Sequence, residues 1–355
     1  MMENTKTVTV TETALKTFCV DVLRHVGVAA GEAALIIDNL VAADMRGVDS
    51  HGVVRLPIYV KRLAAGVINP RPSVWIVRET ATSAVVDGDN GLGQWVGIKG
   101  MEIAIDKALS GACAFVSVRN SNHFGAAAYY AEMAAARDLI GLAFTIGGIN
   151  HMTPWGGAEA ILGNNPFAVA MPAGVEPAVV LDMACSVAAR GKIIVAAKEG
   201  QAIPADWAVG PDGVATTDAL EALKGFVRPV GGPKGYALTL VVGLLSTMLS
   251  DAFFGSEVTH MYDDLERPQN IGHLFAAIPI ALFEDLARYK SRMDKAIAEV
   301  RGVKRAAGVN RVFLPGEREL ISFRACRRAG VPVASAIFDE LVELGRTYGV
   351  TLERA

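Results

Sequence analysis

Residues 112–146 read ACAFVSVRNSNHFGAAAYYAEMAAARDLIGLAFTI and contain the pattern that decides the fold class. The first nine residues are an apolar run rich in β-forming residues, residues 126–137 have a helical composition, and residues 140–146 form a second β-forming run. A strand, a helix and a strand at this spacing are typical of α/β proteins. We therefore predict an α/β fold with a mainly parallel sheet.

The alternation of strands and helices continues on both sides of this stretch. Strands are expected at residues 73–79, 82–89, 166–172 and 178–184, and helices at residues 91–109, 236–250 and 280–300. The two chain ends instead carry helical patterns, at residues 12–26, 31–46, about 50–66, 315–330 and 332–349. A Pro-rich joint at residues 69–72 separates the first end from the sheet. We predict a helical domain made of residues 1–75 and 306–355, and an α/β domain over residues 76–305.

The composition excludes several classes of protein. Of 355 residues, 52% are hydrophobic and 20% are charged, which is too apolar for a disordered chain. The formal net charge is −3, so no excess of positive charge suits nucleic acid or an anionic membrane. The longest uncharged helical candidate, residues 235–250, has 16 residues, fewer than the roughly 20 that span a membrane. We expect it to be a buried core helix.

Two further features indicate a cytoplasmic location. Residues 1–16, MMENTKTVTVTETALK, contain no apolar run of the kind that forms a secretory signal. The cysteines are far apart and form no C-x-x-C pair, as expected for packed, unpaired thiols in a reducing compartment; they are Cys19, Cys113, Cys185 and Cys326.

Charged residues are almost missing from residues 139–181, where Glu159 and Glu176 are the only two. One explanation is a sheet buried on both faces. Another is that this stretch, whose loop GGINHMTPWGG at residues 147–157 is rich in glycine, also lines a buried ligand site. We predict a sheet covered on both faces, and we expect the remaining apolar surplus to form contacts between subunits.

The densest group of polar residues is DSHGVVRLPIY at residues 49–59. On a helix that begins near Ser50, the residues His51, Arg55 and Tyr59 are four apart and share one face. Pro57 would remove one backbone hydrogen bond of that helix and predicts a kink or a late start. Such a stripe could supply an acid/base, a clamp for a carboxylate and a hydroxyl donor. A surface helix that Ser50 merely caps is the alternative.

Other segments lie where α/β proteins bind ligands. Residues 120–125, NSNHFG, follow a predicted strand and precede a predicted helix, although a turn with an Asn cap is the alternative. Asp182 ends a predicted strand, and Lys234 in GGPKG precedes a helix, where an anion could bind. Glycines at positions 91, 93 and 97 approach a dinucleotide fingerprint, but the third glycine is one position late and the acid that should follow is missing. We therefore do not expect an ordinary Rossmann crevice here.

A metal site has little support in the sequence. Asp49, His51, His123 and His151 could be gathered in space, but no H-E-x-x-H motif or paired Cys/His spacing accompanies them. We therefore predict no metal ion.

Several separated motifs resemble those of the malate/L-lactate dehydrogenase family, which is distinct from the Rossmann-type lactate and malate dehydrogenases. They occur in the right order and cover nearly the whole chain: ADMRGVDSHGVVRLPIYVKRL (43–63), VDGDNGLGQ (86–94), NSNHFGAAAYYA (120–131), PWGGAEAILGNNPFAVAMP (154–172), LDMACSVAARGKI (181–193), GGPKGYAL (231–238) and LPGERE (314–319). The resemblance implies an NAD(P)-dependent oxidoreductase that acts on a small 2-hydroxy acid or its 2-oxo counterpart. It also implies an α/β cofactor-binding domain with a topology of its own, and a helical substrate and dimerisation domain built from both chain ends.

The resemblance also assigns roles to individual residues. It implies that His51, with Ser50, carries out acid/base chemistry, that Arg55 clamps the substrate carboxylate, and that Tyr59 and His123 line the same pocket. Either histidine could be the proton carrier. Contacts with NAD or NADP are implied for His123, Phe124, Gly125, Ala126, Ala127, Asp182, Lys234, Gly235, Pro315, Gly316 and Glu317. Family members are homodimers or larger, so we expect a homo-oligomer with the active site near the subunit contact.

Two alternatives to a malate- or lactate-like substrate stay open. The family also includes oxidoreductases of ureidoglycolate, sulfolactate, diketogulonate and cyclic imino acids such as delta1-piperideine-2-carboxylate. Some members carry an acidic residue where this chain has Lys192, which counts against a cyclic-imine reductase. The other alternative is a non-catalytic or metal-dependent binder of small molecules that uses the same pocket.

Overall fold

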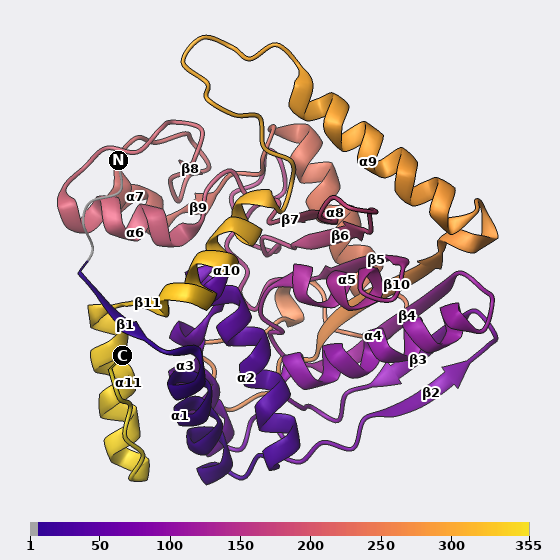
Figure 1. Cartoon of the computed structure of the whole chain (residues 1–355). Helices are drawn as coiled ribbons and strands as arrows, with labels where there is room; N and C mark the ends of the chain where they lie inside the picture. Colours follow the sequence, from indigo (N-terminus) through magenta and orange to yellow (C-terminus); the bar gives the residue numbers. More distant parts are fainter. Residues whose placement is uncertain (1–5, 355) are drawn as a thin grey trace.

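Seven strands form the central sheet of the computed structural model, which describes residues 6–354 (Figure 1). In spatial order they are β2 (Trp75–Glu79), β3 (Ser83–Asp87), β4 (Ala114–Ser121), β10 (Ile271–Pro279), β5 (Leu139–Thr145), β6 (Phe167–Met171) and β7 (Val179–Met183). In this sheet the β3–β4 pair is parallel and every other neighbouring pair is antiparallel. The α/β class is therefore confirmed, whereas the expectation of a mainly parallel sheet is wrong.

A strand that we did not predict from the sequence causes part of this difference, and the hairpin pairs β2–β3, β5–β6 and β6–β7 cause the rest. β10 comes from far along the chain and inserts between β4 and β5, antiparallel to both. β4 and β5 consequently run in the same direction, as the strand-helix-strand pattern of residues 112–146 requires, but they are not neighbours. The sequence of β10, IGHLFAAIP, includes one glycine, two alanines, a proline and a histidine among its apolar residues, so β propensity gave only a weak signal.

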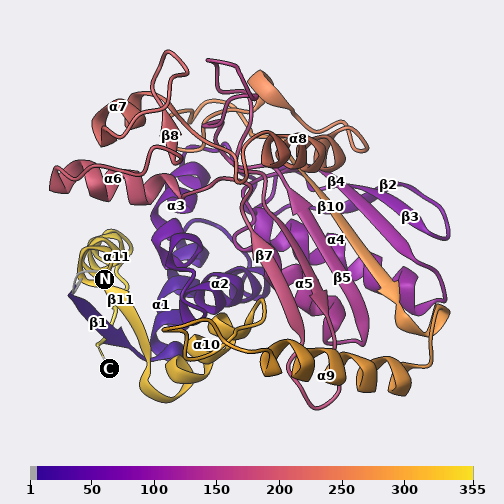
Figure 2. The same cartoon turned by 90° about the horizontal axis from the view of Figure 1, so that it is seen from above.

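Helices cover the two faces of the sheet (Figure 2). α4 (Gly93–Leu109) and α5 (Ala127–Ala135) pack on one face, where a Cβ on Gly100 would lie 2.8 Å from the ring of Phe275. α8 (Pro233–Thr247) packs on the other face, where a Cβ on Gly272 would lie 2.1 Å from the carbonyl oxygen of Ser246. Since residues 272 and 275 of β10 point to opposite sides, both faces of this strand are filled. Eight of the nine residues of β10 are buried.

The expected burial of residues 235–250 is only half right. The sheet-facing side of α8 is buried and consists of small residues, among them Thr239, Gly243 and Ser246. Its outer side exposes large apolar side chains, including 52% of Val241 and 58% of Leu249 just beyond the helix. Within residues 6–354, none of the helices is both long enough and apolar enough to cross a membrane.

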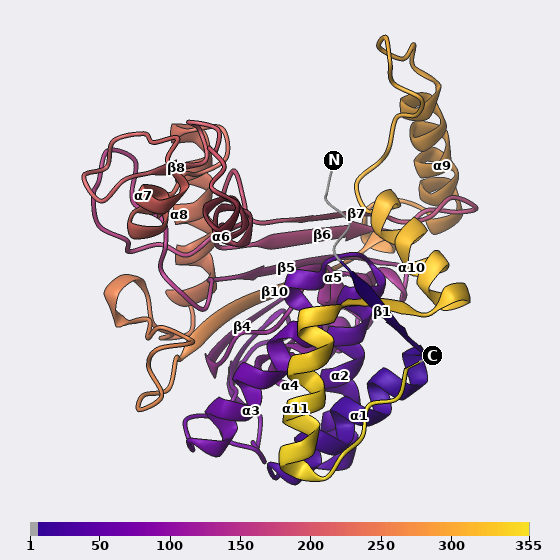
Figure 3. The same ribbon diagram turned by 90° about the vertical axis from the view of Figure 1, so that its left-hand side faces the viewer.

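The two chain ends pack together beside the sheet (Figure 3). They contribute α1 (Glu12–His25), α2 (Ala30–Met45), α3 (Leu56–Ala64), α10 (Glu317–Ala329) and α11 (Ser335–Tyr348), whose buried apolar side chains form one cluster. An unpredicted pair of strands, β1 (Thr7–Val10) and β11 (Val331–Ala334), ties the ends to each other. α1 begins as predicted, because the Thr11 side chain accepts a hydrogen bond from the Ala14 backbone N–H. The division into domains at residues 75 and 306 stays a prediction.

A third part of the chain, between β5 and β10, was not predicted as a unit. It contains α6 (Arg190–Glu199), α7 (Ala219–Lys224) and the short strands β8 (Ala208–Val209) and β9 (Phe226–Val227), with an apolar cluster of its own. α9 (Leu286–Gly302) follows β10, and Ile297 is its one buried residue. Short 3₁₀ turns lie at Asp49–His51, Val53–Arg55, Gly255–Glu257 and Ile280–Leu282.

Two more expectations need correction. The helix expected from Ser50 is absent: two 3₁₀ turns lead into α3, which begins only at Leu56, with Pro57 in its first turn. In residues 139–181 the strands alternate between buried and half-buried residues, so the expected covering of both faces is only partial there. Residues 1–5 of the segment that argued against a secretory signal lie outside the described residues.

The junction of α4, α5 and β10 generates a stability prediction. Phe275 is 0% exposed, and Phe275→Ala should lower the free energy of unfolding by about 3–5 kcal/mol because it leaves a cavity between both helices and the sheet. Phe115→Ala is the matched control, because 49% of that side chain is exposed on the neighbouring strand. Urea denaturation should show the large loss for Phe275→Ala alone; equal losses would contradict the inserted strand.

Candidate functional site

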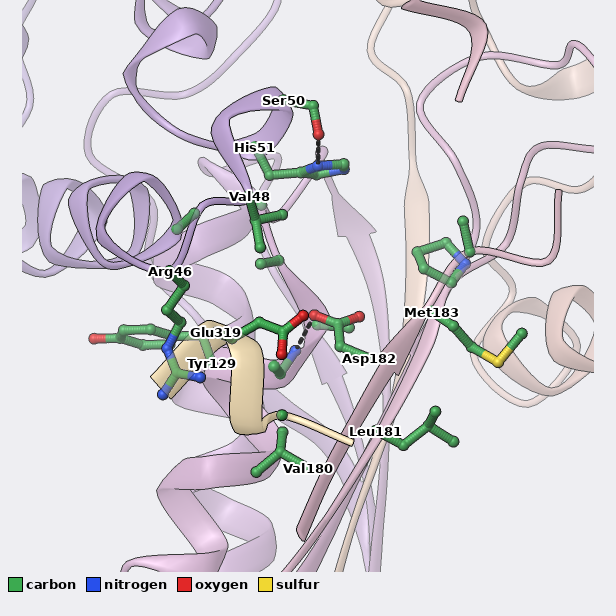
Figure 4. Close-up of a pocket in the computed structure, with 18 of the residues that line it drawn as sticks. Arg46, Val48, Ser50, His51, Tyr129, Val180, Leu181, Asp182, Met183 and Glu319 are labelled. Atoms are coloured by element: carbon green, nitrogen blue, oxygen red, sulfur yellow. Dashed lines mark hydrogen bonds between the residues drawn. The ribbon is translucent and has the colours of Figure 1, made fainter. Parts of the chain in front are cut away.

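A cavity of about 680 Å³ lies between the chain ends and the sheet (Figure 4). Its walls come from α2, the 3₁₀ turn at residues 49–51, the start of α5, the end of β7 and the turn before α10. Eight residues singled out from the sequence line it: Ser50, His51, Gly125, Ala126, Ala127, Asp182, Pro315 and Gly316. The chain thus gathers residues that are more than 250 positions apart in the sequence at one site.

The start of α5 forms one wall of small residues. Gly125 has a φ of +80°, and a Cβ there would lie 2.3 Å from the side-chain oxygen of Asn39, so a larger residue does not fit. Ala126, Ala127 and Ala128 follow and keep the helix N-terminus accessible from the cavity. An accessible helix N-terminus flanked by small residues suits an anionic group such as a phosphate.

Asp182 faces this helix terminus from the end of β7. Its carboxylate accepts a hydrogen bond of 2.9 Å from the Ala128 backbone N–H. Loss of hydration raises the pKa of Asp182 to about 6, and the nearby carboxylates of Glu132 and Glu319 act in the same direction. The Ala128 N–H and Arg46 act in the opposite direction. Figure 4 shows the Glu319 carboxylate directed toward Asp182.

The turn before α10 closes the cavity along the edge of the sheet. The Val180 backbone N–H donates to the Pro315 carbonyl at 3.1 Å, and a Cβ on Gly316 would lie 2.8 Å from the Cβ of Val180. Glu317 does not line the cavity. Its carboxylate is bonded instead by Arg301, Arg311 and the Leu314 backbone N–H, an arrangement that holds the turn in place.

Lys234 and Gly235 also lie away from the cavity walls. They belong to the first turn of α8, where Lys234 is exposed. A Cβ on Gly235 would lie 1.7 Å from the Val230 carbonyl oxygen, so glycine is required here by close packing of the loop on the helix.

Two histidines meet at one end of the cavity. The rings of His51 and His123 are stacked, with their centroids 5.5 Å apart. Ser50 Oγ lies 2.9 Å from His51 Nδ1, and the Arg55 Nε–H donates to the Ser50 carbonyl at 2.6 Å. The buried Asp44 of α2 fixes this turn, because its carboxylate accepts from the Val53 backbone N–H at 2.8 Å.

His123 is also held from its other side. Its Nδ1 lies 2.7 Å from the hydroxyl oxygen of Tyr59, which in turn accepts from the side-chain amide of Gln94 at 2.9 Å. Phe124, the next residue, stacks on the buried ring of His273 with centroids 4.6 Å apart. His51, Tyr59 and His123 are therefore in contact, although the helix expected to align His51 with Tyr59 is absent.

The electrostatic environment keeps both imidazoles neutral at neutral pH. Burial, with a further contribution from the charge on Arg55, lowers the pKa of His51 to about 4. Burial also lowers the pKa of His123 well below its usual range, and Arg55, His51 and His273 add to this effect. A neutral imidazole can accept a proton or donate a hydrogen bond, so the pair suits acid/base chemistry.

Sequence reasoning missed several residues of the site. Gln94 stands in the VDGDNGLGQ motif and Glu319 in LPGERE, but neither was given a role. Asn39 and Arg46 lie on α2, and their helical spacing indicated only a packed face. Tyr129 of α5 likewise gave no signal beyond helix periodicity. In residues 6–354, no three His, Cys, Asp or Glu side chains are grouped so as to hold a metal ion.

The cavity has the size and the kind of lining expected of a dinucleotide site. Its volume lies within the range of about 300–1,000 Å³ usual for cofactor sites, and one wall combines small residues with a helix N-terminus. His51 lines the cavity, whereas His123, Phe124, Arg55 and Tyr59 do not; His123 lies behind His51 and stacks on its ring.

Comparison with known proteins identifies the family. The family model described as malate/L-lactate dehydrogenase matches residues 10–342. Malate dehydrogenase of Pyrococcus abyssi is 39% identical over 344 residues, which is 95% of this chain and 94% of that protein. L-Sulfolactate dehydrogenase of Methanocaldococcus jannaschii is 39% identical over 338 residues, 95% of this chain and 96% of that protein.

The solved structures agree. The sulfolactate dehydrogenase from Methanocaldococcus jannaschii superimposes with a TM-score of 0.91 at 37% identity and covers 98% of both chains. The chain therefore belongs to the malate/L-lactate dehydrogenase family and is a nicotinamide-dependent dehydrogenase that acts on a CH–OH group.

Proposed function

We propose that this protein transfers a hydride between NAD(P) and a small 2-hydroxy acid of the malate or lactate type. The observation that carries the proposal is the stacked pair of His51 and His123, with Tyr59 and Arg55 beside it, of which His51 lines the 680 Å³ cavity. Relatives named malate, sulfolactate and ureidoglycolate dehydrogenase support this class of substrate.

Arg55 and His51 would perform the two tasks that such a substrate needs. The guanidinium of Arg55 would bind the substrate carboxylate, since its planar fork matches a carboxylate. In the oxidation direction, His51 would take the hydroxyl proton. If Ser50 accepts from the Nδ1–H of His51 at 2.9 Å, Nε2 carries the free electron pair that receives it. A bound nicotinamide would supply the hydride acceptor.

The cofactor would lie in the cavity described above. Gly125, Ala126, Ala127, Asp182, Pro315 and Gly316 are the proposed cofactor contacts that line it. Glu317 would act by holding Pro315 and Gly316 in place. Both NAD and NADP remain candidates, because the name of a relative from Escherichia coli specifies NAD(+) and that of one from Chromohalobacter salexigens specifies NADP(+).

We also propose a homodimer or larger oligomer in the cytoplasm. The apolar outer side of α8 and the half-buried strands β5 to β7 leave apolar surface available for a second subunit. The four cysteines are free thiols, three of them buried, which suits a reducing compartment.

The proposed activity is tested by a panel of substrates. NADH and NADPH are each mixed with 2-oxo acids and with cyclic imines, including delta1-piperideine-2-carboxylate, and the nicotinamide absorbance is followed. A 2-oxo acid should give the highest kcat/KM, because Arg55 and the histidines suit a carboxylate beside a carbonyl group. Preference for a cyclic imine would favour the reductase alternative. Binding of neither cofactor, measured by nicotinamide fluorescence, would favour the non-catalytic binder.

The role of His51 predicts a pH profile. A base with a pKa of about 4 is neutral above that pH, so kcat/KM for oxidation should stay high down to about pH 5 and fall only below it. His51→Ala should lower kcat/KM by about 10²–10⁴-fold at pH 7. His25→Ala is the control, because His25 lies on the far end of α1, where its ring contacts Tyr348. Near-normal kcat/KM in His51→Ala would contradict the assignment of His51 as the base.

The role of Arg55 predicts a binding defect. Arg55→Lys keeps the positive charge but loses the planar fork, so KM for the 2-hydroxy acid should rise by about tenfold or more while KM for the cofactor stays unchanged. Arg267→Lys is the control, because that exposed guanidinium is paired with Asp264 on the surface. An unchanged substrate KM in Arg55→Lys would contradict the clamp.

A further inference from the structure

Gln94 is a buried polar residue that contacts Tyr59, the neighbour of His123. It is the second residue of α4, and its side chain is 0% exposed. The start of α4 lies directly against the backbone next to His123, since a Cβ on Gly93 would be 2.0 Å from the Asn122 carbonyl oxygen. This approach, which only glycine permits, brings the Gln94 amide within 2.9 Å of the Tyr59 hydroxyl.

The hydrogen bonds around His123 fix where its proton lies. The Gly125 backbone N–H points at His123 Nδ1 at 3.4 Å, and a backbone N–H can only donate. This contact favours an unprotonated Nδ1, although at 3.4 Å it is too long to hold the tautomer without the Tyr59 hydroxyl, which lies 2.7 Å from the same nitrogen. A neutral imidazole has one N–H, so the proton of His123 lies on Nε2.

The same logic orders the chain of donors behind His123. Because Nδ1 accepts, the Tyr59 hydroxyl 2.7 Å away donates its hydrogen to Nδ1. The Tyr59 oxygen is then free to accept, and the Gln94 amide donates to it. Burial raises the pKa of Tyr59 to about 12, so the hydroxyl keeps the hydrogen that it donates. Because the Gln94 amide donates to the Tyr59 oxygen, the one hydrogen of the Tyr59 hydroxyl is directed at His123.

We propose that Gln94 is a positioning residue that acts through Tyr59 to hold His123 in the Nε2–H tautomer, so that His123 donates a hydrogen bond to the reacting oxygen while His51 takes the proton. This inference rests on the proposed function for the reaction, but the tautomer itself is a property of the free protein. His51 and His123 thereby have separate roles, which the family resemblance did not distinguish.

The rest of the environment of His123 is compatible with this assignment. The groups that face its ring are Tyr59 and Arg55 from the segment around α3, His51 from the preceding turn, and His273 from β10. Among them Arg55 alone is charged at neutral pH, and it disfavours an imidazolium. Within the described residues, no carboxylate bonds to His123 that could hold a second proton on the ring.

Three variants test the proposal. Gln94→Met removes the donor at similar size, and Gln94→Glu replaces it with a carboxylate that accepts from Tyr59 and so turns the chain around. Gln269→Met is the matched control: Gln269 is 1% exposed, and its amide donates to the Gly148 and Thr259 carbonyls away from the histidines. Nitrogen-15 NMR of the imidazoles in the ligand-free protein reports the tautomer directly.

In the wild type and in Gln269→Met, His123 should show the Nε2–H tautomer. Gln94→Met should mix the two tautomers, and Gln94→Glu should move the proton to Nδ1. Both Gln94 variants should lower kcat by at least about tenfold with little change in cofactor binding. Gln94→Glu should also shift the pH limb of kcat upward, since a carboxylate in this chain favours a protonated ring.

The outcomes separate this inference from the proposed function. A wild-type His123 protonated on Nδ1, or Gln94 variants that keep both the tautomer and the pH profile, would overturn the inference. If the Gln94 variants do not fold, Tyr59→Phe removes the donor to Nδ1 and should mix the tautomers in the same way. If the tautomers are as stated but the substrate panel gives no turnover, the proposed function fails and the tautomer assignment stands.

Discussion

The rest of the structure depends on the two hydrogen bonds made by the buried ring of His273. Its Nδ1 lies 2.7 Å from the Thr145 hydroxyl on β5, and its Nε2 lies 2.8 Å from the Ser121 hydroxyl on β4. Burial lowers the pKa of this histidine to about 3, so it remains a neutral link between three strands across the whole physiological range. Its ring also stacks on Phe124. β10, in the middle of the sheet, thereby holds the turn that carries His123.

The site is assembled from elements of different rigidity. His123 follows β4 and Asp182 lies near the end of β7, whereas His51 and Arg55 stand on two 3₁₀ turns with few hydrogen bonds of their own. The buried Asp44 side chain compensates for this, because it accepts a hydrogen bond from the Val53 backbone N–H and so ties the turns to α2. A Cβ on Gly52 would overlap that carboxylate, which explains why the motif has glycine after its histidine.

The parts of the fold that the sequence predicted are those with local signals. α1 has a capping threonine, α1 and α2 both show a 3.6-residue period, and β4, α5 and β5 follow from composition alone. β10 could not be found this way, because its place between β4 and β5 is set by contacts distant in sequence. The same holds for the site. The S-H-G and N-H-F-G motifs could be recognised in the sequence, whereas the role of Gln94 depends on the packing of α4 against the backbone next to His123.

The turn before α10 has a second consequence for the molecule. β7 is the last strand of the sheet, and an open strand edge invites pairing with strands of other molecules. Here the Val180 N–H is already taken by the Pro315 carbonyl, and Pro315 itself offers no N–H to continue the ladder. The wall of the ligand cavity is thus also a protective cap on the sheet edge. A change that loosens this turn would expose the molecule to aggregation as well as weaken ligand binding.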